Sequence, residues 1–315
     1  MISANVVADS VSPHGVRLTT MALRYPKFIH GELMTHRVFS RNASSSRAVP
    51  TARLIAEARG DDTRASFVWW GKNQPGMAAA EELSDDPSSN IFGVSQKRAA
   101  RLAWKHAAED AAEAAERLVA IGAHKQLVNR LLEPFTHINV LVSATEWDNF
   151  FGLRLHDDAQ PEMRALATAM WQAHVSSIPC EIGFGAWHTP YYDEEDFEPV
   201  EIYADAGNKW TPLEVGLRVS VARCARVSYA SFDTGRRSTI EEDLRLYDRL
   251  VGAQPLHASP AEHVATPDPK TYRIFKDVPL MSNDRHLWGN FIGWNQYRKT
   301  LPGEARAPLP ERYRR

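Results

Sequence analysis

Polar side chains that can bind an anion gather in one short segment, THRVFSRNASSSRA, near the beginning of the chain. The candidate residues are His36, Arg37, Ser40, Asn42, Ser45, Ser46 and Arg47. Guanidinium groups bind phosphate oxygens in a bidentate manner and keep their charge at neutral pH, and hydroxyl groups suit the same oxygens. The segment therefore indicates a phosphate site, with an ordinary serine-rich surface loop as the alternative.

A second candidate, Arg154, lies at the end of a predicted helix, directly before the start of another one. Such a position suits an anion because the N-terminus of a helix carries a partial positive charge. The same arginine could pair with Asp157 or Asp158, and these residues alone favour that ion pair. Arg130, which precedes the helix-ending Pro134, is equally ambiguous.

The segment PLHASPAEH holds a third group, made of His257, Ser259, Glu262 and His263. Pairs of histidines suggest a metal site, but this spacing fits no metalloprotease motif. Structural histidines are therefore the favoured interpretation, and no metal is expected.

Nucleophilic catalysis by the chain itself has weak support. The chain has two cysteines, Cys180 and Cys224, which fit neither a disulfide framework nor the spacing of a zinc site. There is no G-x-S-x-G motif, in which a serine would be the nucleophile.

The composition excludes several classes of protein. The 315 residues are 43% hydrophobic and 24% charged, as in folded globular proteins, and the net charge of −2 argues against a protein that coats nucleic acid. No apolar run of about 18 residues could cross a membrane. The first residues lack the pattern of a secretory signal, so we expect a cytoplasmic protein.

Helices and strands in an α+β arrangement must position these residues. Residues 15–24 are rich in β-branched side chains and predict a strand. An alanine-rich run over residues 95–121, closed by Gly122, predicts a long helix. Further helices are predicted over residues 26–37, 124–133, 138–155, 213–228 and 239–251, and one more after Asp157 as its cap. Loops are predicted over residues 40–51 and 60–93, and a turn-rich inserted or connecting region over residues 180–212.

Taken together, the motifs resemble the flavin-dependent thymidylate synthases. The family signature R-H-R-x-x-S-x-N-E-x-S-x-R-Y is matched at His36, Arg37, Ser40, Asn42, Ser45 and Arg47. A second segment, N-F-x-x-L-R followed by A-Q-x-E, is matched at Asn149, Phe150, Leu153, Arg154, Ala159, Gln160 and Glu162. The motif H-x-S-P-F-E-H is matched at His257, Ser259, Pro260, Glu262 and His263, and A-R-V-S-Y at residues 225–229.

The order of these motifs differs from that of the family, in which A-R-V-S and H-x-S-P precede the signature. The chain therefore resembles a circular permutant, which is tolerable because domain termini usually lie at the surface. We expect one permuted domain, with the signature and helical part in residues 1–178, a connecting insert in 179–212, and the family's amino-terminal part in 213–315. The resemblance implies an α+β fold of the thymidylate synthase-complementing type, with a long central helical part and a mixed or antiparallel sheet.

The resemblance also implies a reaction: methylation of dUMP at C5, which gives dTMP. Methylenetetrahydrofolate would supply the carbon, and FAD reduced by NADPH would supply the hydride. No enzyme cysteine would attack the pyrimidine. The family is a homotetramer whose sites are assembled from several subunits, and it implies no nucleic-acid or membrane partner.

Site residues follow from the same resemblance. Arg154 would contact the pyrimidine and act in catalysis. The nucleotide would be bound by Glu32, Ser45, Ser46, Arg47 and Arg130, together with Arg154. FAD would be bound by His36, Arg37, Asn42, Asn149, Ser228, His257, Ser259 and Glu262.

Several positions depart from the family pattern. Thr35, Ala43 and Ala48 replace an Arg, a Glu and a Tyr of the signature, and Glu32 replaces a Gln that contacts the nucleotide. Asp158 and Thr145 stand where a His and a flavin-contacting Arg are common. These changes leave three alternatives: methylation of another pyrimidine nucleotide, C5-hydroxymethylation, or a relic that binds nucleotide or flavin without turnover.

Overall fold

A five-stranded sheet forms the centre of the computed structural model, which describes residues 2–60, 69–76, 79, 81–89, 93–228, 236–253, 256–273 and 279–304. Its strands are β1 (Ser3–Val11), β2 (Arg17–Pro26), β3 (Ser40–Ala43), β4 (His137–Ala144) and β5 (Cys180–Glu181). They lie in the order β3-β4-β2-β1-β5. All neighbours are antiparallel except β1 and β5, which are parallel, so the sheet is mixed.

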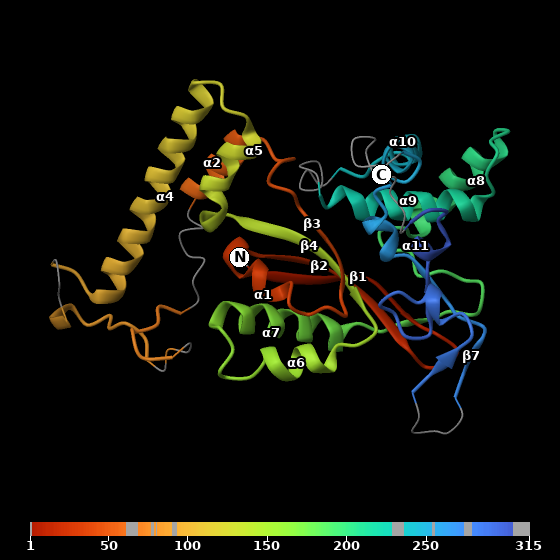
Figure 1. The fold of residues 1–315 in the computed structure, drawn as a ribbon, viewed down its shortest axis with the longest axis horizontal. Helices are drawn as coiled ribbons and strands as arrows, with labels where there is room; N and C mark the ends of the chain where they lie inside the picture. The colour runs from red at the N-terminus through yellow and green to blue at the C-terminus, as the bar shows by residue number, and fades with distance from the viewer. Residues whose placement is uncertain are drawn as a thin grey trace, which may run out of the picture.

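Helices on both sides complete the α+β fold that the sequence predicts (Figure 1). The α-helices are α1 (His30–Leu33), α2 (Thr51–Arg59), α4 (Gln96–Ala120), α5 (Lys125–Val128), α6 (Asp148–Arg154), α7 (Pro161–Ser176), α8 (Phe197–Asp205), α9 (Pro212–Arg226), α10 (Ile240–Leu250) and α11 (Tyr297–Thr300). Short 3-10 helices include η1 (Lys27–Ile29), η2 (Pro87–Ser89), η3 (Asn129–Phe135), η4 (Glu194–Asp196), η6 (Ser259–Glu262) and η7 (Arg285–Leu287). Two small antiparallel pairs join β6 (Ala265–Pro267) to β9 (Trp294–Gln296) and β7 (Thr271–Tyr272) to β8 (Met281–Ser282).

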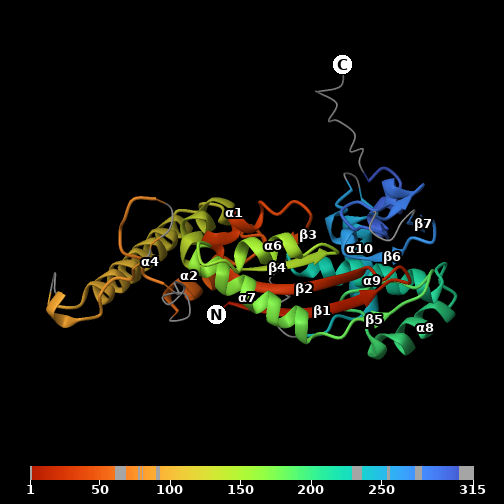
Figure 2. The same ribbon diagram turned by 90° about the horizontal axis from the view of Figure 1, so that it is seen from below.

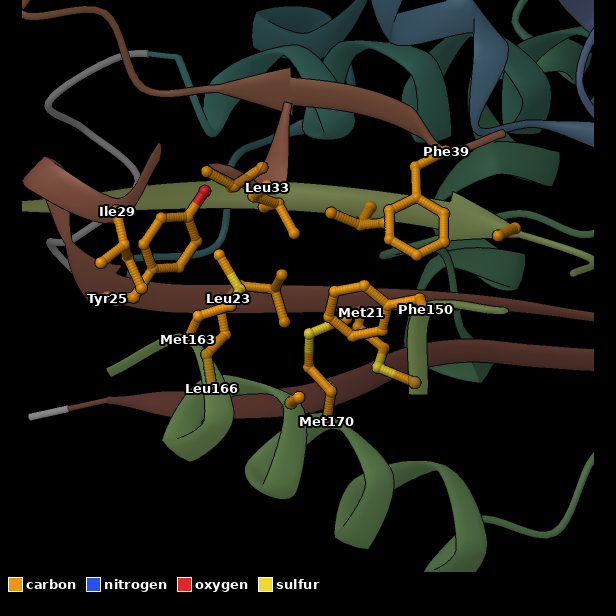
Figure 3. Packing of buried hydrophobic residues seen from close by; sticks show 14 of the residues in the cluster. Met21, Leu23, Tyr25, Ile29, Leu33, Phe39, Phe150, Met163, Leu166 and Met170 are labelled. Carbon is orange, nitrogen blue, oxygen red and sulfur yellow. The ribbon is translucent and has the colours of Figure 1, made fainter. Parts of the chain in front are cut away.

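The two faces of the sheet pack against different helices. On one face, alternate residues of β2 and β4 meet α6 and α7, as Figure 3 shows for Met21, Leu23 and Tyr25 opposite Met163 and Met170. On the other face, Leu141 of β4 packs against Cys224 and Val227 at the end of α9. This alternation follows from the strand geometry, in which successive side chains point to opposite faces.

A helical arm extends from one end of the sheet (Figure 2). The helix α4 begins at Ser95, whose side chain accepts a hydrogen bond from the backbone N–H of Arg98. It ends before Gly122, which takes the positive φ of 81° that glycine permits. Small residues such as Ala108, Ala112 and Ala115 let α4 pack closely on α2, α5 and η3.

Capping residues explain where the carboxyl-terminal helices begin. Thr211 and Glu214 form a capping box at α9, and Thr239 and Glu242 form one at α10. The two helices pack together through an apolar cluster that includes Leu217, Val221, Leu246 and Tyr247. The last turn of α9 lies beside β3, where the side chain of Asn42 donates a hydrogen bond to the carbonyl of Cys224.

The structure corrects several predicted elements. Residues 138–155 are not one helix: they form the central strand β4 and then α6. Apolar residues on both faces of a buried strand hide its alternation, so periodicity could not separate the two. Helix 26–37 is shorter than predicted and ends at Leu33.

The loop predicted over residues 40–51 and the connecting region predicted over 180–212 also contain regular elements. Residues 40–51 include the edge strand β3, and residues 180–212 include β5 and α8. The sequence analysis placed no helix over α2. Asp157 does not cap α7, whose N-cap is Gln160, and instead forms an ion pair with Arg164. Among the described residues, no helix is long and apolar enough to cross a membrane.

Candidate functional site

Two segments that are far apart in the sequence meet at β3. The side-chain amide of Asn42 donates a hydrogen bond to the carbonyl oxygen of Cys224 at 2.8 Å. The hydroxyl of Ser228 contacts the side-chain oxygen of Asn42 at 3.3 Å and the carbonyl of Ala43 at 3.1 Å. The backbone N–H of Ser45 donates to the carbonyl of Ser228. The signature segment and the A-R-V-S segment are thus neighbours in space.

A pocket of about 490 Å³ opens beside this junction. We call it the junction pocket. It is lined by Asn42, Ser45, Arg47, Ala48, Gln126, Ala225, Ser228, Leu250, His257, Ser259 and Pro260. Eight of the residues predicted from the sequence for site roles are absent from this lining, and their positions are given below. The predicted residues that do line it are Asn42, Ser45, Arg47, Ser228, His257 and Ser259.

The polar groups of the junction pocket differ in how they are held. Asn42 is buried and fixed by its hydrogen bonds, whereas Arg47, His257 and Ser259 are exposed. In the described part of the chain, the Arg47 side chain has neither a hydrogen-bond partner nor an ion-pair partner. Its charge is therefore available to an anion.

The loop that carries Ser45 and Arg47 is bound to η3. Asn129 is fully buried, and its amide donates to the carbonyls of Ser46 at 2.6 Å and Val49 at 3.0 Å. Its side-chain oxygen accepts from the hydroxyl of Thr51 at 2.7 Å. Asn129 thus holds the loop at Ser46, Val49 and Thr51, and we call this set of hydrogen bonds the Asn129 clamp. Asn129 was not among the predicted site residues.

Ser46 and Arg130 do not line the junction pocket but bind a carboxylate. Glu133 accepts from the hydroxyl of Ser46 at 2.9 Å, from Arg130 at 2.8 Å and from Lys27 at 2.6 Å. Burial raises the pKa of Glu133, but the hydrogen bonds of Lys27 and Ser46 outweigh it and hold that pKa below its ordinary value. Ionised Glu133 thus binds the side chains of Ser46 and Arg130, which were predicted to bind the nucleotide.

Arg154 contacts His36, and not the aspartates that the local sequence favoured. Its Nε lies 2.9 Å from Nε2 of His36, and one of its terminal nitrogens lies 3.4 Å from the Thr35 hydroxyl. The imidazole of His36 packs edge-on against the ring of Phe150, with ring centroids 4.8 Å apart. The prediction that Arg154 pairs with Asp157 or Asp158 was therefore wrong.

The other predicted site residues lie outside the junction pocket. Arg37 and Asn149 are exposed, and Glu32 is partly buried in α1. Glu262 forms an ion pair with Arg298. His36 and Arg154 therefore form a second group on the chain, separate from the lining of the junction pocket, and Arg37 follows His36 in the sequence.

The histidines of the third motif have different environments. His263 is fully buried and its Nδ1 lies 2.8 Å from the hydroxyl of Ser143, as expected of a structural histidine. His257 is exposed at the junction pocket. Within the residues that the structure describes, no group of three or more His, Cys, Asp or Glu side chains could hold a metal ion.

Neither cysteine belongs to the junction pocket. Cys224 is fully buried in α9, and burial raises the pKa of its thiol far above neutrality. Cys180 is exposed in β5. A neutral buried thiol is a poor nucleophile, so the geometry gives no support to covalent catalysis by Cys224.

Comparison with known proteins adds a family match. Residues 11–180 match the family model described as thymidylate synthase complementing protein. No curated protein sequence matches significantly. Among solved structures, the UMP/dUMP methylase PolB from Streptomyces cacaoi bound with 5-Br UMP is similar at 18% identity and a TM-score of 0.40, over 56% of this chain and 89% of that chain. The same enzyme bound with 5-Br dUMP has 18% identity and a TM-score of 0.37, over 56% of this chain and 90% of that chain.

Proposed function

Because the chain belongs to the thymidylate synthase complementing protein family, we propose that this thymidylate synthase-like methyltransferase methylates dUMP at C5 and gives dTMP. Methylenetetrahydrofolate is the proposed carbon donor, FAD the cofactor and NADPH the reductant. The observation that carries the proposal is the junction pocket, where residues of the signature and of the carboxyl-terminal motifs line one cavity.

The lining of the junction pocket fits the polar groups of FAD. Its amide, hydroxyl and imidazole side chains can hydrogen-bond phosphate oxygens or the edge of a flavin ring. A volume of about 490 Å³ lies within the range of cofactor sites. Asn42, Ser228, Ser259 and His257 are the residues that would hold FAD, which when bound supplies hydride chemistry.

Ser45 and Arg47 are the proposed phosphate ligands of the nucleotide. The guanidinium of Arg47 has no protein partner in the described residues, so no ion pair must break before it binds a phosphate. The Asn129 clamp holds the loop in place, which lowers the entropy that binding would cost. Ser46 and Arg130 would reach the phosphate only after leaving Glu133.

Arg154 is the proposed catalytic residue. A fixed guanidinium beside the pyrimidine stabilises negative charge that develops on the ring oxygens during attack by C5. His36 orients it, because the unprotonated Nε2 accepts from Nε of Arg154. Burial and the nearby charges of Arg154 and Arg41 lower the pKa of His36 and keep it neutral at physiological pH.

A homotetramer is the proposed working form. His36, Arg37 and Arg154 do not line the junction pocket of their own chain. A site that needs both groups would be complete where one chain meets another. Glu262 and Asn149 are proposed FAD contacts in the same assembly, and Glu262 would keep or exchange its ion pair with Arg298.

We also propose that the chain is a circular permutant of the family. The family match ends at residue 180, and the A-R-V-S and H-x-S-P segments lie beyond it. The hydrogen bonds of the Ser228 hydroxyl to Asn42 and to the carbonyl of Ala43 support this proposal, because the segments adjoin despite their reversed order. The predicted connecting insert, residues 179–212, is folded, and its helix α8 packs on α9.

The alternative substrates remain a second candidate. Glu32, Ala43 and Ala48 change the charge and the donors of the signature, and Ala48 lines the junction pocket. A pocket built for one pattern of hydrogen bonds rejects another because unpaired polar groups are costly. Another pyrimidine nucleotide, or a hydroxymethyl product, would follow from such a change.

A flavin spectrum followed by a nucleotide panel tests the proposal. The purified protein should retain a visible FAD spectrum after desalting, and dUMP should perturb it. With methylenetetrahydrofolate and NADPH, the product from dUMP should be dTMP. Retained FAD with turnover of UMP or CMP alone would favour the alternative nucleotide. A protein that binds FAD or nucleotide but forms no product would be the relic, and a protein that binds neither would contradict the proposal.

A further inference from the structure

A second recess is lined by arginines of α9 and α10 and of the segment before α10. It has a volume of about 500 Å³, and we call it the arginine hollow. Its lining consists of Arg226, Arg236, Glu242, Arg245, Asp248 and Arg249. Four guanidinium groups face two carboxylates, which leaves a net charge of +2 in one concave surface.

Internal ion pairs account for only part of this charge. Arg236 places one nitrogen 2.9 Å from each oxygen of Glu242, and that carboxylate also caps α10 through the backbone of Thr239. Arg226 uses its Nε to contact Asp243 at 2.8 Å. Asp243 is also bound by Arg223, so its charge is shared.

Two arginines of the hollow have no such partner. The side chains of Arg245 and Arg249 form neither a hydrogen bond nor an ion pair with any residue that the structure describes. They are four residues apart on α10, so they lie on one face of the helix, where like charges destabilise it. The C-terminal dipole of α10 favours a cation in the last turn, which accounts for Arg249 and not for Arg245. A bound anion would relieve the repulsion.

The hollow and the junction pocket share the ends of two helices. Ala225 of α9 and Leu250 of α10 line the junction pocket. The adjacent residues, Arg226 and Arg249, line the hollow. One extended ligand could therefore place its ring system in the first recess and an anionic group in the second.

We propose that the arginine hollow binds a phosphate group of a nucleotide cofactor whose remainder enters the junction pocket. Arginine forks match phosphate oxygens, and Arg245 and Arg249 would provide the new contacts. The choice of a nucleotide cofactor rests on the proposed function. Two sources share this chemistry: the diphosphate of FAD and the phosphates of NADPH.

Calorimetry with 2′,5′-ADP on the full-length protein tests the site without turnover. We expect the double variant Arg245→Gln/Arg249→Gln to bind this probe roughly 10- to 100-fold more weakly than the wild type. Raising the salt concentration should reduce the difference, because both arginines are exposed. The matched control Arg98→Gln/Arg101→Gln changes two exposed arginines of α4 and should bind as the wild type does.

The arms of the experiment separate the sources of the phosphate. Weaker binding of NADPH to the double variant, with unchanged binding of NADH, would identify the 2′-phosphate of NADPH. Weaker FAD binding with an unchanged NADPH-to-NADH preference would identify the diphosphate of FAD. If the double variant bound both FAD and NADPH as tightly as the wild type does, the inference would be overturned. Because these binding results need no methyl transfer, an inactive protein would contradict the proposed function alone.

Discussion

The Nε–H of Arg154 donates a hydrogen bond of 2.9 Å to Nε2 of His36. Arginine can only donate, so this bond requires an unprotonated Nε2. The pair joins the end of α6 to the loop between α1 and β3, where Phe39 and Phe150 pack against the imidazole. Protonation of His36 would break the bond and place two cations side by side.

Because His36 orients the guanidinium of Arg154, we expect that a positive charge alone at position 154 does not support full turnover. Arg154→Lys keeps the charge but loses the planar donor fork, so we expect turnover to fall roughly 100-fold or more. Arg154→Ala should abolish turnover, and both variants should still fold and bind FAD. Steady-state rates and the visible spectrum measure these effects, with Arg164→Lys as the control on the neighbouring helix α7. An active Arg154→Ala enzyme would show that this arginine has no catalytic role.

Arg47 has a separate role in nucleotide affinity. Arg47→Ala removes a bidentate phosphate contact, and we expect nucleotide binding to weaken by about 1.5–3 kcal/mol. FAD affinity should change less, since Asn42 and Ser228 remain. Calorimetric titration with dUMP and with deoxyuridine distinguishes the contact, because the nucleoside lacks the phosphate. If the variant lost affinity for both ligands equally, Arg47 would not be a phosphate ligand.

The Asn129 clamp should control the phosphate loop. Asn129→Asp keeps the shape and the acceptor for Thr51 but cannot donate to the carbonyls of Ser46 and Val49. We expect a loss of about 1–3 kcal/mol in unfolding free energy, because two buried carbonyls lose their donors. The dUMP affinity should fall and the FAD affinity should change less, as measured by titration on the folded fraction. Thr51→Val, which removes only the contact to Asn129, should have a smaller effect, and an unchanged dUMP affinity in Asn129→Asp would contradict the clamp.

Two buried histidines predict acid sensitivity of the fold. Burial lowers the pKa of His188 and of His263 to about 3 in the folded chain. The unfolded chain binds these protons near pH 6.5, so the free energy of unfolding falls as the pH drops from about 6.5 toward 3. Each histidine should remove about 2 kcal/mol between pH 6.5 and 5, and above pH 7.5 neither should change the stability.

Denaturant unfolding at several pH values measures this effect. His188 lies between the hydroxyls of Ser10 and Thr20, at 2.9 and 2.8 Å. The charge of Asp9 raises the pKa of His188 by less than burial lowers it. The variant His188→Asn should be less stable at neutral pH, yet its stability should fall less steeply between pH 6.5 and 5. His156→Gln, at an exposed position, should keep the wild-type slope. An unchanged slope in His188→Asn would rule out this histidine as a source of the acid sensitivity.

Local patterns in the sequence located α4, α9 and α10 well. Alanine-rich composition and Gly122 marked α4 to within one residue at each end, because helix propensity and capping act over a few neighbouring residues. The helices predicted over residues 213–228 and 239–251 correspond to α9 and α10. The motifs of the signature and of the H-x-S-P segment indicated the family, and the match over residues 11–180 confirms it.

Tertiary structure alone decided which residues share a cavity. The sequence of β4 is compatible with a helix or a strand, because both faces of the strand are buried. Only its pairing with β2 and β3 shows that it is a strand. The partner of Arg154 lies 118 residues away, and that of Asn42 lies 186 residues away, so local sequence favoured the wrong ion pair in the first case. Hydrogen bonding depends on distance in space, and the sequence supplies only distance along the chain.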